Sequence, residues 1–365
     1  MNKNQIWQKK KSFLNKSENV EAWFCDEKQF NMNVRYGKPL NINSLRSSEI
    51  YSTEAKNLEK ARIFFDTLNT FDTVASCPVC ETLTSKATPV VKVWSATYME
   101  CSGCGHGYCD ITPSESAVTK YYSENILGNT YYTNPDQIEN RIEQIYAPKL
   151  DWIISSYEKS FGRKPKSILD LGAGSAHFLE TCKRKGLQVS GLEIDETYRA
   201  WAEKNFGIML YKDAQALLKS NLKVFDVVTS FNVIEHIPQP AEFLKLYDTF
   251  SNEESLIVVE TPKFNSVSSA LQKIYPERIR GHLMPYIHVH MFSDNSLATI
   301  LNNHGFTPAH AWFFGQDITE LFYHLSLELK QDVLPLLSSV FNPLQEVLDN
   351  ACSSDLMIFG AVKKK

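Results

Sequence analysis

Residues 165–195 read PKSILDLGAGSAHFLETCKRKGLQVSGLEID, and this stretch decides the fold of the chain. Its run 167–171 is short and apolar and follows Pro165, which predicts a buried strand of a parallel sheet. A glycine-rich turn comes next, where Gly172 and Gly174 let the backbone turn sharply and bring N–H groups close to a ligand. Apolar spacing from Phe178 onward then predicts a helix packed on that strand.

A second strand is predicted over 187–192, and it ends in Glu193. A carboxylate 23 positions after Asp170 lies where a β-α-β nucleotide site accepts hydrogen bonds from ribose hydroxyls. The third glycine of a dinucleotide fingerprint is missing, because Ser175, Ala176 and His177 follow the second one. An acidic strand end facing the ligand suits a cation better than a phosphate. The plain alternative is an ordinary α/β turn with incidental glycines.

The stretch closely resembles the first motif of class I S-adenosylmethionine-dependent methyltransferases, the E/D-x-G-x-G loop with an acidic residue closing the second strand. This resemblance implies an α/β fold with a seven-stranded Rossmann-like sheet and helices on both faces. It also implies S-adenosylmethionine as cofactor, bound by residues at the carboxyl rim of the sheet, namely Asp170, Gly172, Gly174, Glu193, Asp213 and Asn232. For Asp213, an N-cap of the helix predicted over 214–220 is an equally good interpretation.

The strands expected from this resemblance are 167–171, 187–192, 208–211, 225–230, 255–260, 309–314 and 356–362, the last two forming an antiparallel hairpin. Four regions are expected along the chain. They are an N-terminal region of unknown role (1–72), a zinc ribbon (73–112), a helical linker or lid (113–163) and the methyltransferase domain (164–365), which has a helical insertion at about 317–350.

The N-terminal region is the least informative part of the chain. Residues 1–50 are expected to form irregular structure or short strands leaning on a neighbour, and 52–68 an amphipathic helix. In the linker, Ser114 is predicted to cap a short helix. The paired tyrosines Tyr121, Tyr122, Tyr131 and Tyr132 are interpreted as packing residues, with a lid over the cofactor as the alternative.

Composition places the chain among globular proteins. Its 365 residues are 43% hydrophobic and 22% charged, enough for two or three domains. A net charge of −4 argues against a large nucleic-acid footprint. No apolar run reaches 18 residues and the start MNKNQIWQKKK lacks a signal-peptide core, so a cytoplasmic protein without a membrane span is expected.

Four of the eight cysteines form two C-x2-C pairs separated by 20 residues. This spacing predicts a closed, structural zinc site, with Cys77, Cys80, Cys101 and Cys104 as ligands. His106 and Cys109 are alternative ligands, although packing roles suit them better. Two chance pairs of buried or redox thiols remain the plain alternative.

Histidines gather after the fifth predicted strand. Methyl transfer from a sulfonium requires alignment of the acceptor and, for a hydroxyl or amine, removal of a proton. Histidine is the natural base near neutral pH, and the spacing of His288 and His290 directs both to one side of an extended segment. The candidate bases are His290, then His288, then His236. Each of them also has an ordinary structural interpretation as a hydrogen-bonded polar residue.

A metal-assisted variant resembles plant small-RNA 2′-O-methyltransferases, which bind a divalent ion with an E-x-x-E-H segment and a distant histidine. The matching positions are Asn232, Glu235 and His236, completed by His288 or His290. Asn232 is a weaker ligand than the glutamate it replaces. The segment therefore predicts either a second divalent ion near Glu235 and His236 or a simpler role for both residues in packing of the pocket.

These features predict a methyltransferase that modifies an oxygen or nitrogen of a small hydroxylated acceptor, such as a sugar or glycan precursor. The chain resembles ubiquinone-type O-methyltransferases and a bacterial group associated with sugar and surface-polysaccharide modification. The alternatives are an RNA methyltransferase that grips nucleic acid with its ribbon, where Lys86 and Lys92 are isolated, and a non-catalytic interaction module that binds the cofactor. The sequence leaves the oligomeric state open.

Overall fold

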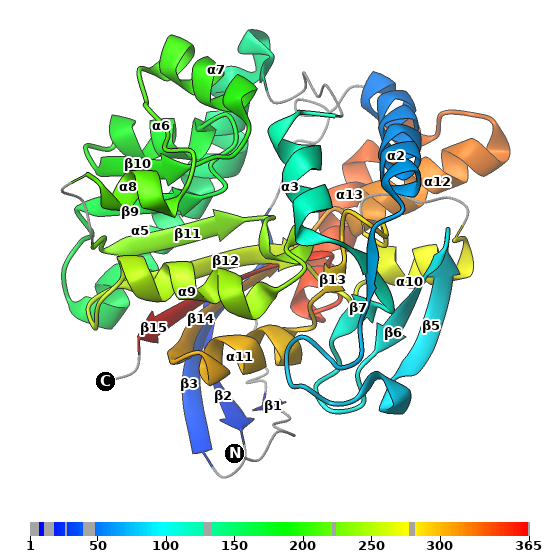
Figure 1. Cartoon of the computed structure of the whole chain (residues 1–365), viewed down its shortest axis with the longest axis horizontal. Helices are drawn as coiled ribbons and strands as arrows, with labels where there is room; N and C mark the ends of the chain where they lie inside the picture. Colours follow the sequence, from blue (N-terminus) through cyan, green and yellow to red (C-terminus); the bar gives the residue numbers. More distant parts are fainter. Residues whose placement is uncertain are drawn as a thin grey trace.

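The computed structural model describes residues 7–10, 18–25, 28–38, 48–126, 133–220, 224–276 and 282–363. In these ranges one large mixed sheet forms the centre of the molecule, with helices on both faces (Figure 1). Its nine described strands run in the order β1-β2-β3-β14-β15-β12-β11-β9-β10. The predicted α/β class and methyltransferase-like sheet are therefore confirmed, and the sheet is larger than the seven strands expected.

Six strands of this sheet follow the predicted ranges closely. They are β9 Ser167–Leu171, β10 Gln188–Leu192, β11 Val227–Phe231, β12 Leu256–Pro262, β14 Phe306–Phe314 and β15 Leu356–Lys363. β10, β9, β11 and β12 are parallel neighbours, whereas β15 runs antiparallel to both β12 and β14. The expected antiparallel hairpin at the end of the chain is thus present.

The strand predicted over 208–211 is wrong as a full strand. Gly207 ends the preceding helix in a left-handed conformation, and only Tyr211 then pairs with Leu192, through an isolated parallel bridge. Ile208 and Leu210 are buried and Met209 is exposed, so the chain alternates like a strand. It turns away at Asp213 before a ladder can form.

Alternation along the strands divides the core into two layers. In β12, Ile257 and Val259 pack on one face, whereas Leu256 and Val258 pack on the other. The helices of the first face are α8 Ala214–Leu218, α9 Pro240–Phe250 and α11 Asp294–Asn303, and those of the second are α5 Ala147–Phe161, α6 His177–Arg184 and α7 Glu196–Phe206.

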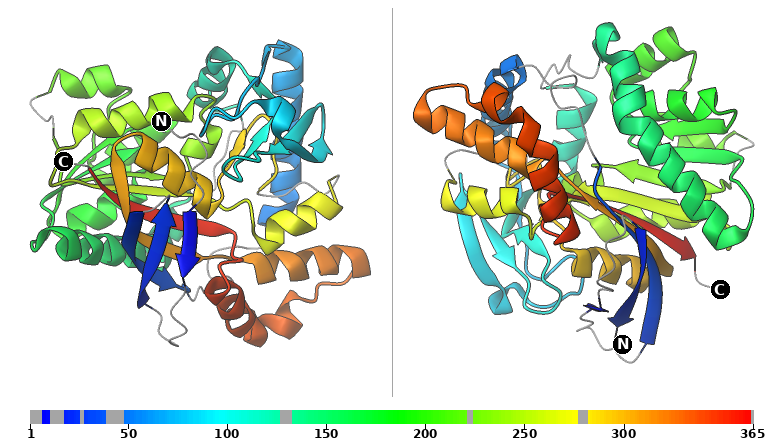
Figure 2. Two further views of the ribbon diagram at one scale, coloured as in Figure 1. Left: turned by 90° about the horizontal axis from the view of Figure 1, so that it is seen from below. Right: turned by 180° about the vertical axis from the view of Figure 1, so that it is seen from behind.

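Three N-terminal strands extend the sheet beyond β14. They are β1 Trp7–Lys10, β2 Glu18–Cys25 and β3 Lys28–Tyr36, and β3 pairs in parallel with β14. Figure 2 shows these three strands at the edge of the main sheet. Trp23 is fully buried and its ring meets Phe359 of β15 edge-on. The short strands expected within residues 1–50 are therefore present, as an edge of the main sheet.

A smaller sheet carries the cysteine pairs. Its order is β13-β7-β6-β5, where β5 is Thr88–Val93, β6 Ala96–Glu100 and β7 Gly107–Cys109. The fourth strand, β13 His290–Met291, comes from the histidine-rich segment nearly two hundred residues later in the chain. β4 Phe71–Thr73 and β8 Ile111–Pro113 pair beside it. The ribbon and the histidine-rich segment therefore share one sheet.

The remaining helices agree with the expected regions. α2 Ser48–Leu68 includes the predicted amphipathic helix, and α3 Glu115–Ser123 begins at Ser114, whose side chain accepts from the Ala117 N–H. α4 Ile138–Arg141 leads through a π-helical turn into α5. α10 Val267–Ile274 follows β12, and α12 Asp317–Leu329 with α13 Leu334–Asn350 form the helical insertion. Tyr131 and Tyr132 lie outside the described residues.

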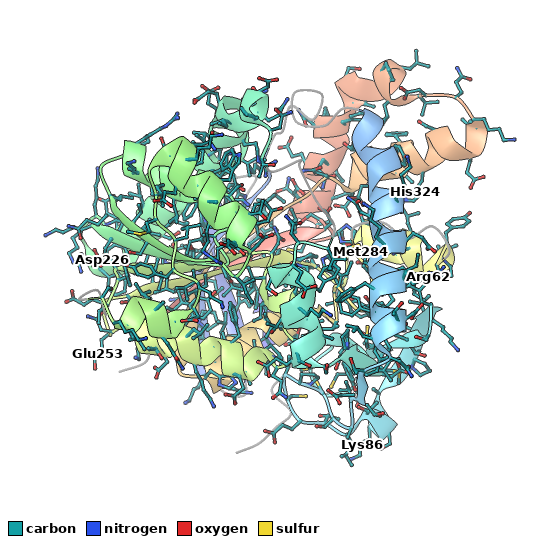
Figure 3. The ribbon with its side chains drawn as sticks, turned by 45° about the horizontal axis from the view of Figure 1, so that its top comes forward. Arg62, Lys86, Asp226, Glu253, Met284 and His324 are labelled. Carbon is teal, nitrogen blue, oxygen red and sulfur yellow. The ribbon has the colours of Figure 1, made fainter. Side chains whose placement is uncertain are left out.

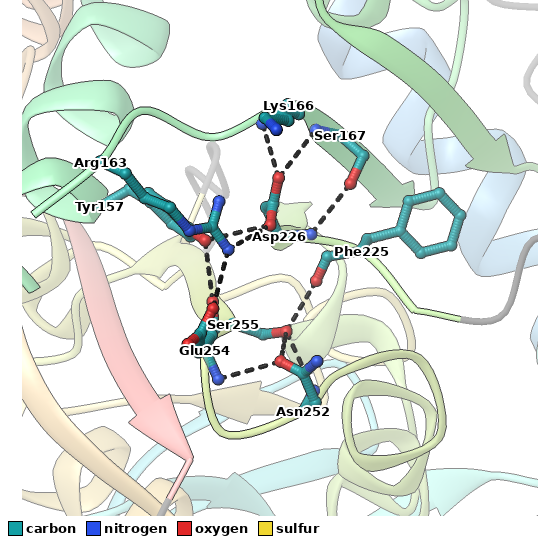
Figure 4. Close-up of polar contacts among 9 residues, drawn as sticks. All are labelled: Tyr157, Arg163, Lys166, Ser167, Phe225, Asp226, Asn252, Glu254 and Ser255. Carbon is teal, nitrogen blue, oxygen red and sulfur yellow. Dashed lines mark hydrogen bonds and ion pairs between the residues drawn. The ribbon is translucent and has the colours of Figure 1, made fainter. Parts of the chain in front are cut away.

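Asp226 ties the start of β11 to its surroundings (Figure 4). Its carboxylate accepts from Arg163 at 2.9 Å, from the Tyr157 hydroxyl at 3.0 Å and from the Lys166 N–H at 2.6 Å. These contacts lie at the amino end of the parallel strands, opposite the rim where ligands collect. In Figure 3, Asp226 lies at the left edge of the molecule, well away from Met284, which lies to the right of its centre. Asp226 is therefore a structural residue.

Candidate functional site

The loop between β9 and α6 makes a tight turn at the carboxyl rim of the sheet. Gly172 has a φ of +79°, and a Cβ built on it would lie 2.6 Å from Cγ2 of Val233. The N–H groups of Gly172 and Ala173 both donate to the Leu192 carbonyl, at 2.9 and 2.8 Å. Glycine is required here because a side chain would enter the segment that follows β11.

Glu193 lies at the end of β10 and is held by the backbone. One carboxylate oxygen accepts from the Gly174 N–H at 2.7 Å, and the other accepts from the Asp195 N–H at 2.8 Å. Burial raises the pKa of this carboxyl, while the two N–H groups oppose that rise. The predicted pairing of the glycine loop with an acidic strand end is thus present in the geometry.

The other predicted cofactor residues lie along the same rim in different environments. Asp170 is buried and accepts from the Thr229 hydroxyl at 2.7 Å, and burial raises its pKa to about 7. Asp213 is exposed and caps α8 by accepting from the Ala216 N–H at 2.8 Å. The N-cap interpretation of Asp213 is therefore confirmed, and its contact with adenine stays a prediction.

Asn232 belongs to a polar group that sequence analysis did not find. It has a φ of +54°, and its amide donates to Glu260 Oε1 at 2.9 Å. The same oxygen lies 2.7 Å from the Lys149 ammonium, in a pair with side chains only 1% and 6% exposed. Lys149 comes from α5 and Glu260 from β12, so no local sequence pattern connects them.

The three candidate histidines come together where the ribbon meets the sheet. The rings of His236 and His288 have centroids 4.8 Å apart. His290 lies nearby, because its Nε2 is 3.3 Å from the carbonyl of Pro238, two residues after His236. Val233, which contacts Gly172, belongs to the same segment, so the histidines lie beside the glycine loop.

The ring nitrogens distinguish these histidines. Nδ1 of His236 lies 2.9 Å from the Ile287 carbonyl, and Nδ1 of His288 lies 2.8 Å from the His282 carbonyl. A carbonyl only accepts, so both Nδ1 atoms carry a proton and both Nε2 atoms present a lone pair. His290 differs, since its Nδ1 lies 3.2 Å from His106 Nε2 and its Nε2 faces Pro238.

Glu235 completes a group with His236 and His288. One ligand atom from each lies within 4.8 Å of the others. The Glu235 carboxylate is fully buried, and among the described residues neither oxygen has a hydrogen bond of ordinary geometry, although the Thr261 hydroxyl lies close enough to oppose the rise in its pKa. Burial raises the Glu235 pKa to about 8 and lowers the His236 pKa to about 4. Two imidazole lone pairs and a buried carboxylate fit a divalent cation, with the carbonyls orienting the rings.

A lid over this group is supported by one contact. Tyr122 of α3 places its ring 5.6 Å, centroid to centroid, from that of His236. Its neighbour Tyr121 is buried against Phe65 of α2 instead. Of the two tyrosines, Tyr121 therefore packs in the core and Tyr122 lies on the site.

The four cysteines converge as predicted. Cys77 Sγ and Cys104 Sγ are 3.7 Å apart, and Cys80 Sγ and Cys101 Sγ are 3.5 Å apart. A tetrahedral zinc with bonds of about 2.3 Å requires sulfur separations of about 3.8 Å. All four side chains are buried, so the group fits a closed structural zinc. His106 and Cys109 are not part of it.

The two cysteine pairs adopt matching turns. The Cys77 N–H donates to the Thr82 carbonyl, and the Glu81 N–H donates back to the Cys77 carbonyl. In the second turn, the Cys101 N–H donates to the His106 carbonyl and the Gly105 N–H to the Cys101 carbonyl. The second turn therefore fixes the backbone of His106, the residue that contacts His290.

Comparison with known proteins agrees with this geometry. Residues 147–311 match the protein family described as "Methyltransferase domain". The match begins at α5 and ends in β14, and it includes the glycine loop, Glu193 and the histidine group. It excludes the four cysteines and the helical insertion.

Curated relatives match a shorter part of the chain. A ubiquinone biosynthesis O-methyltransferase of Aeromonas salmonicida is 29% identical over 126 residues, which is 33% of this chain and 52% of that protein. One from Sodalis glossinidius is 31% identical over 103 residues, 27% of this chain and 40% of the relative. The chain thus spans about half or less of the relatives it matches.

Solved structures resemble the chain more broadly and at lower identity. A SAM-dependent methyltransferase from Archaeoglobus fulgidus is 21% identical with a TM-score of 0.41, covering 64% of this chain and 100% of that one. A magnesium protoporphyrin IX methyltransferase from Synechocystis PCC 6803 is 12% identical with a TM-score of 0.42, covering 66% and 100%.

Proposed function

Because the chain carries a class I S-adenosylmethionine-dependent methyltransferase domain, we propose that it methylates an oxygen or nitrogen of a small hydroxylated acceptor, such as a sugar or glycan precursor. The observation that carries this proposal is the convergence of Glu235, His236 and His288 beside the glycine loop. The relatives named ubiquinone biosynthesis O-methyltransferases support transfer to oxygen.

The cofactor fits the rim formed by Gly172, Gly174 and Glu193. S-adenosylmethionine, when bound, supplies an electrophilic methyl group on a positively charged sulfur. The buried carboxyls Asp170 and Glu193 favour that positive charge, and the Glu193 carboxylate is the acceptor for ribose hydroxyls. Asp213 lies next along the rim and is the proposed contact for adenine.

The acceptor is held beside His236 and His288 in this proposal. His288 Nε2 carries the lone pair that takes the proton of an acceptor hydroxyl, since its Nδ1 proton is bound by the His282 carbonyl. Burial keeps the pKa of His288 well below its ordinary value, so the ring is neutral near pH 7. His290, the first candidate base from the sequence, has both ring nitrogens engaged, by His106 and by Pro238, and supports this region instead.

A divalent ion at Glu235, His236 and His288 is the variant that the buried carboxylate and the two nearby rings favour. Such an ion would lower the pKa of an acceptor hydroxyl. Methyl transfer should then fall in a chelator that leaves the four-cysteine zinc in place, and Mn²⁺ or Mg²⁺ should restore it. Full activity under that chelator would exclude the ion and leave His288 as the base.

Labelled methyl from S-adenosylmethionine, added with the protein to a fractionated cell extract, tests the acceptor class. Label in a small-molecule or glycan fraction, lost with His288→Ala, supports the proposal. Label in RNA, together with a salt-sensitive gel shift, would replace it with the nucleic-acid alternative. Lys86 lies exposed at the tip of the ribbon (Figure 3). Cofactor binding with no label in any fraction would favour the interaction module.

Among the described residues, no helix combines the length and apolarity that a bilayer crossing requires.

A further inference from the structure

A second cluster of acidic and histidine side chains lies outside the site described above. His282 of the histidine-rich segment, Glu320 of α12 and Asp355 at the start of β15 each offer a ligand atom, and these lie within 4.8 Å of one another. His282 and Asp355 are each 4% exposed. His282 Nε2 lies 3.4 Å from Glu320 Oε2 and also 3.4 Å from Asp355 Oδ2.

An ion pair is the alternative to a metal ion in this arrangement. An N–H···O hydrogen bond is about 2.7–3.2 Å long, so a proton shared between the two carboxylates makes a long three-centre contact with each. His282 Nδ1 is buried without a partner in the described part of the chain, and it would carry a proton both in a charged ring and in a ring bound to a metal through Nε2. A single ion between the three side chains satisfies the equal distances better than one proton does.

The spacing matches metal coordination. Nitrogen and oxygen ligands about 2.1 Å from a tetrahedral metal ion lie about 3.4 Å from each other. The imidazole–carboxylate separations have this length before any ion is placed. One imidazole and two carboxylates suit a divalent first-row ion such as Zn²⁺ or Mn²⁺.

The surrounding backbone holds the Asp355 carboxylate in place. Its Oδ1 accepts from the Gln316 N–H at 2.8 Å, which directs Oδ2 toward His282. Asp317 accepts from the Asp355 N–H at 2.9 Å. At Gly315, an added Cβ would lie 2.0 Å from Asp355 Oδ1 and 2.6 Å from Asp317 Oδ2. The two carboxylates therefore close around a backbone position that leaves no space for a side chain.

The local charge favours a cation. Asp317 and Asp349 are buried beside this cluster and are joined by the Gln345 amide, at 3.1 and 2.9 Å. A bound divalent ion would offset part of the repulsion among these buried carboxyl groups.

We propose that His282, Glu320 and Asp355 form a third metal site, which binds a divalent transition-metal ion. It is separate from the four cysteines and from the Glu235 group. The His282 carbonyl accepts from Nδ1 of His288, so an ion on the His282 side chain would anchor the helical insertion to the backbone that orients His288. Only the link between this ion and the orientation of His288 rests on the proposed function. Binding of the ion itself is measured as metal content, which does not depend on activity.

Metal content of the full chain tests the site in a Glu235→Gln background, which removes the other mixed-ligand group. Each protein is dialysed against Zn²⁺, freed of loose metal and measured by mass spectrometry. The background and its Glu346→Ala control, an exposed glutamate of α13, should retain about two zinc ions per chain. His282→Gln and Glu320→Ala should each retain about one, releasable by a thiol-specific mercurial.

Equal zinc content in all four proteins would overturn the proposal. Circular dichroism and thermal unfolding of the zinc-loaded proteins check that each variant is folded. Should His282→Gln fail to fold, Glu320→Ala decides alone, since its side chain lies nearer the surface. A folded Glu320→Ala chain that keeps about two zinc ions would be as decisive against the site.

Discussion

His106 and His290 lie side by side where β7 of the ribbon pairs with β13, with His106 Nε2 3.2 Å from His290 Nδ1. His290 Nε2 faces the Pro238 carbonyl, which only accepts, so that nitrogen carries the proton. His290 Nδ1 must then accept from His106, and His106 Nδ1 lies 3.3 Å from Ser296 Oγ, whose proton is also directed at the Ser293 carbonyl 3.1 Å away. Both nitrogens of His290 are committed, whereas His288 keeps one lone pair.

Substitution of the histidines should separate these roles. We expect His288→Gln to lower kcat by about 100-fold or more with little change in cofactor affinity, because a general base is lost. His106→Gln should lower kcat by a smaller factor, because it acts only through its contact with His290. Single-turnover methyl transfer measures the chemical step, and cofactor titration provides the control. An unchanged rate in His288→Gln would exclude it as the base.

Glu193→Ala should weaken S-adenosylmethionine binding by about tenfold or more, because charged hydrogen bonds contribute about 1.5–3 kcal/mol. The Gly174 and Asp195 N–H groups also lose their acceptor. Calorimetric titration compares it with Glu196→Ala, an exposed glutamate on α7. Equal affinities in the two variants would mean that the cofactor does not use this strand end.

Cys104→Ser should release about one zinc ion per chain and lower the unfolding temperature, because structural zinc contributes directly to folding. Cys352→Ser is the matched control, since Cys352 is half-buried and outside the cysteine group. Mercurial titration with a zinc indicator and thermal unfolding give the two measurements. Retention of zinc in Cys104→Ser would contradict a four-cysteine site.

Lys149→Met should lower the free energy of unfolding by about 3–5 kcal/mol, because it leaves the buried carboxylate of Glu260 without its cation. The double variant Lys149→Met/Glu260→Gln should recover much of this loss. Urea unfolding of the two variants and the wild type measures the difference. A double variant no more stable than Lys149→Met would show that the charge is not the cause.

Stability should fall as the pH drops from about 7 toward 4, in part because of His310. Burial, then Lys159, lowers the pKa of His310 to about 4, and Ser160 Oγ lies 2.8 Å from its Nε2. The folded state therefore binds its proton less readily than the unfolded chain. This group should cost about 2 kcal/mol of stability at pH 5. His310→Gln should flatten the urea-unfolding profile between pH 7 and 5, and an unchanged slope would contradict this assignment.

The sequence predicts those parts of the site that lie close together along the chain. The glycine loop, Glu193 and the two cysteine pairs each fall within a short stretch whose spacing carries the geometry. The position of Ser114 as a helix cap is predicted for the same reason, because an N-cap is a local contact.

Contacts between distant elements could not be predicted. Lys149 and Glu260, or His106 and His290, meet only because the fold brings separate elements together. The strand predicted over 208–211 is wrong for a different reason. Buried and exposed residues alternate there as in a strand, but the chain leaves the sheet after a single bridge. The two-residue strand β13 is too short for any periodicity to reveal.

The pairing of β3 with β14 has a consequence for synthesis of the protein. Asn33 pairs with His310, so the N-terminal strands emerge from the ribosome long before their neighbour in the sheet exists. Until then, β3 presents an unpaired strand edge, which is a template for association with other chains. Such distant pairing also slows folding. Newly made chains should therefore depend on chaperones until β14 has been synthesised.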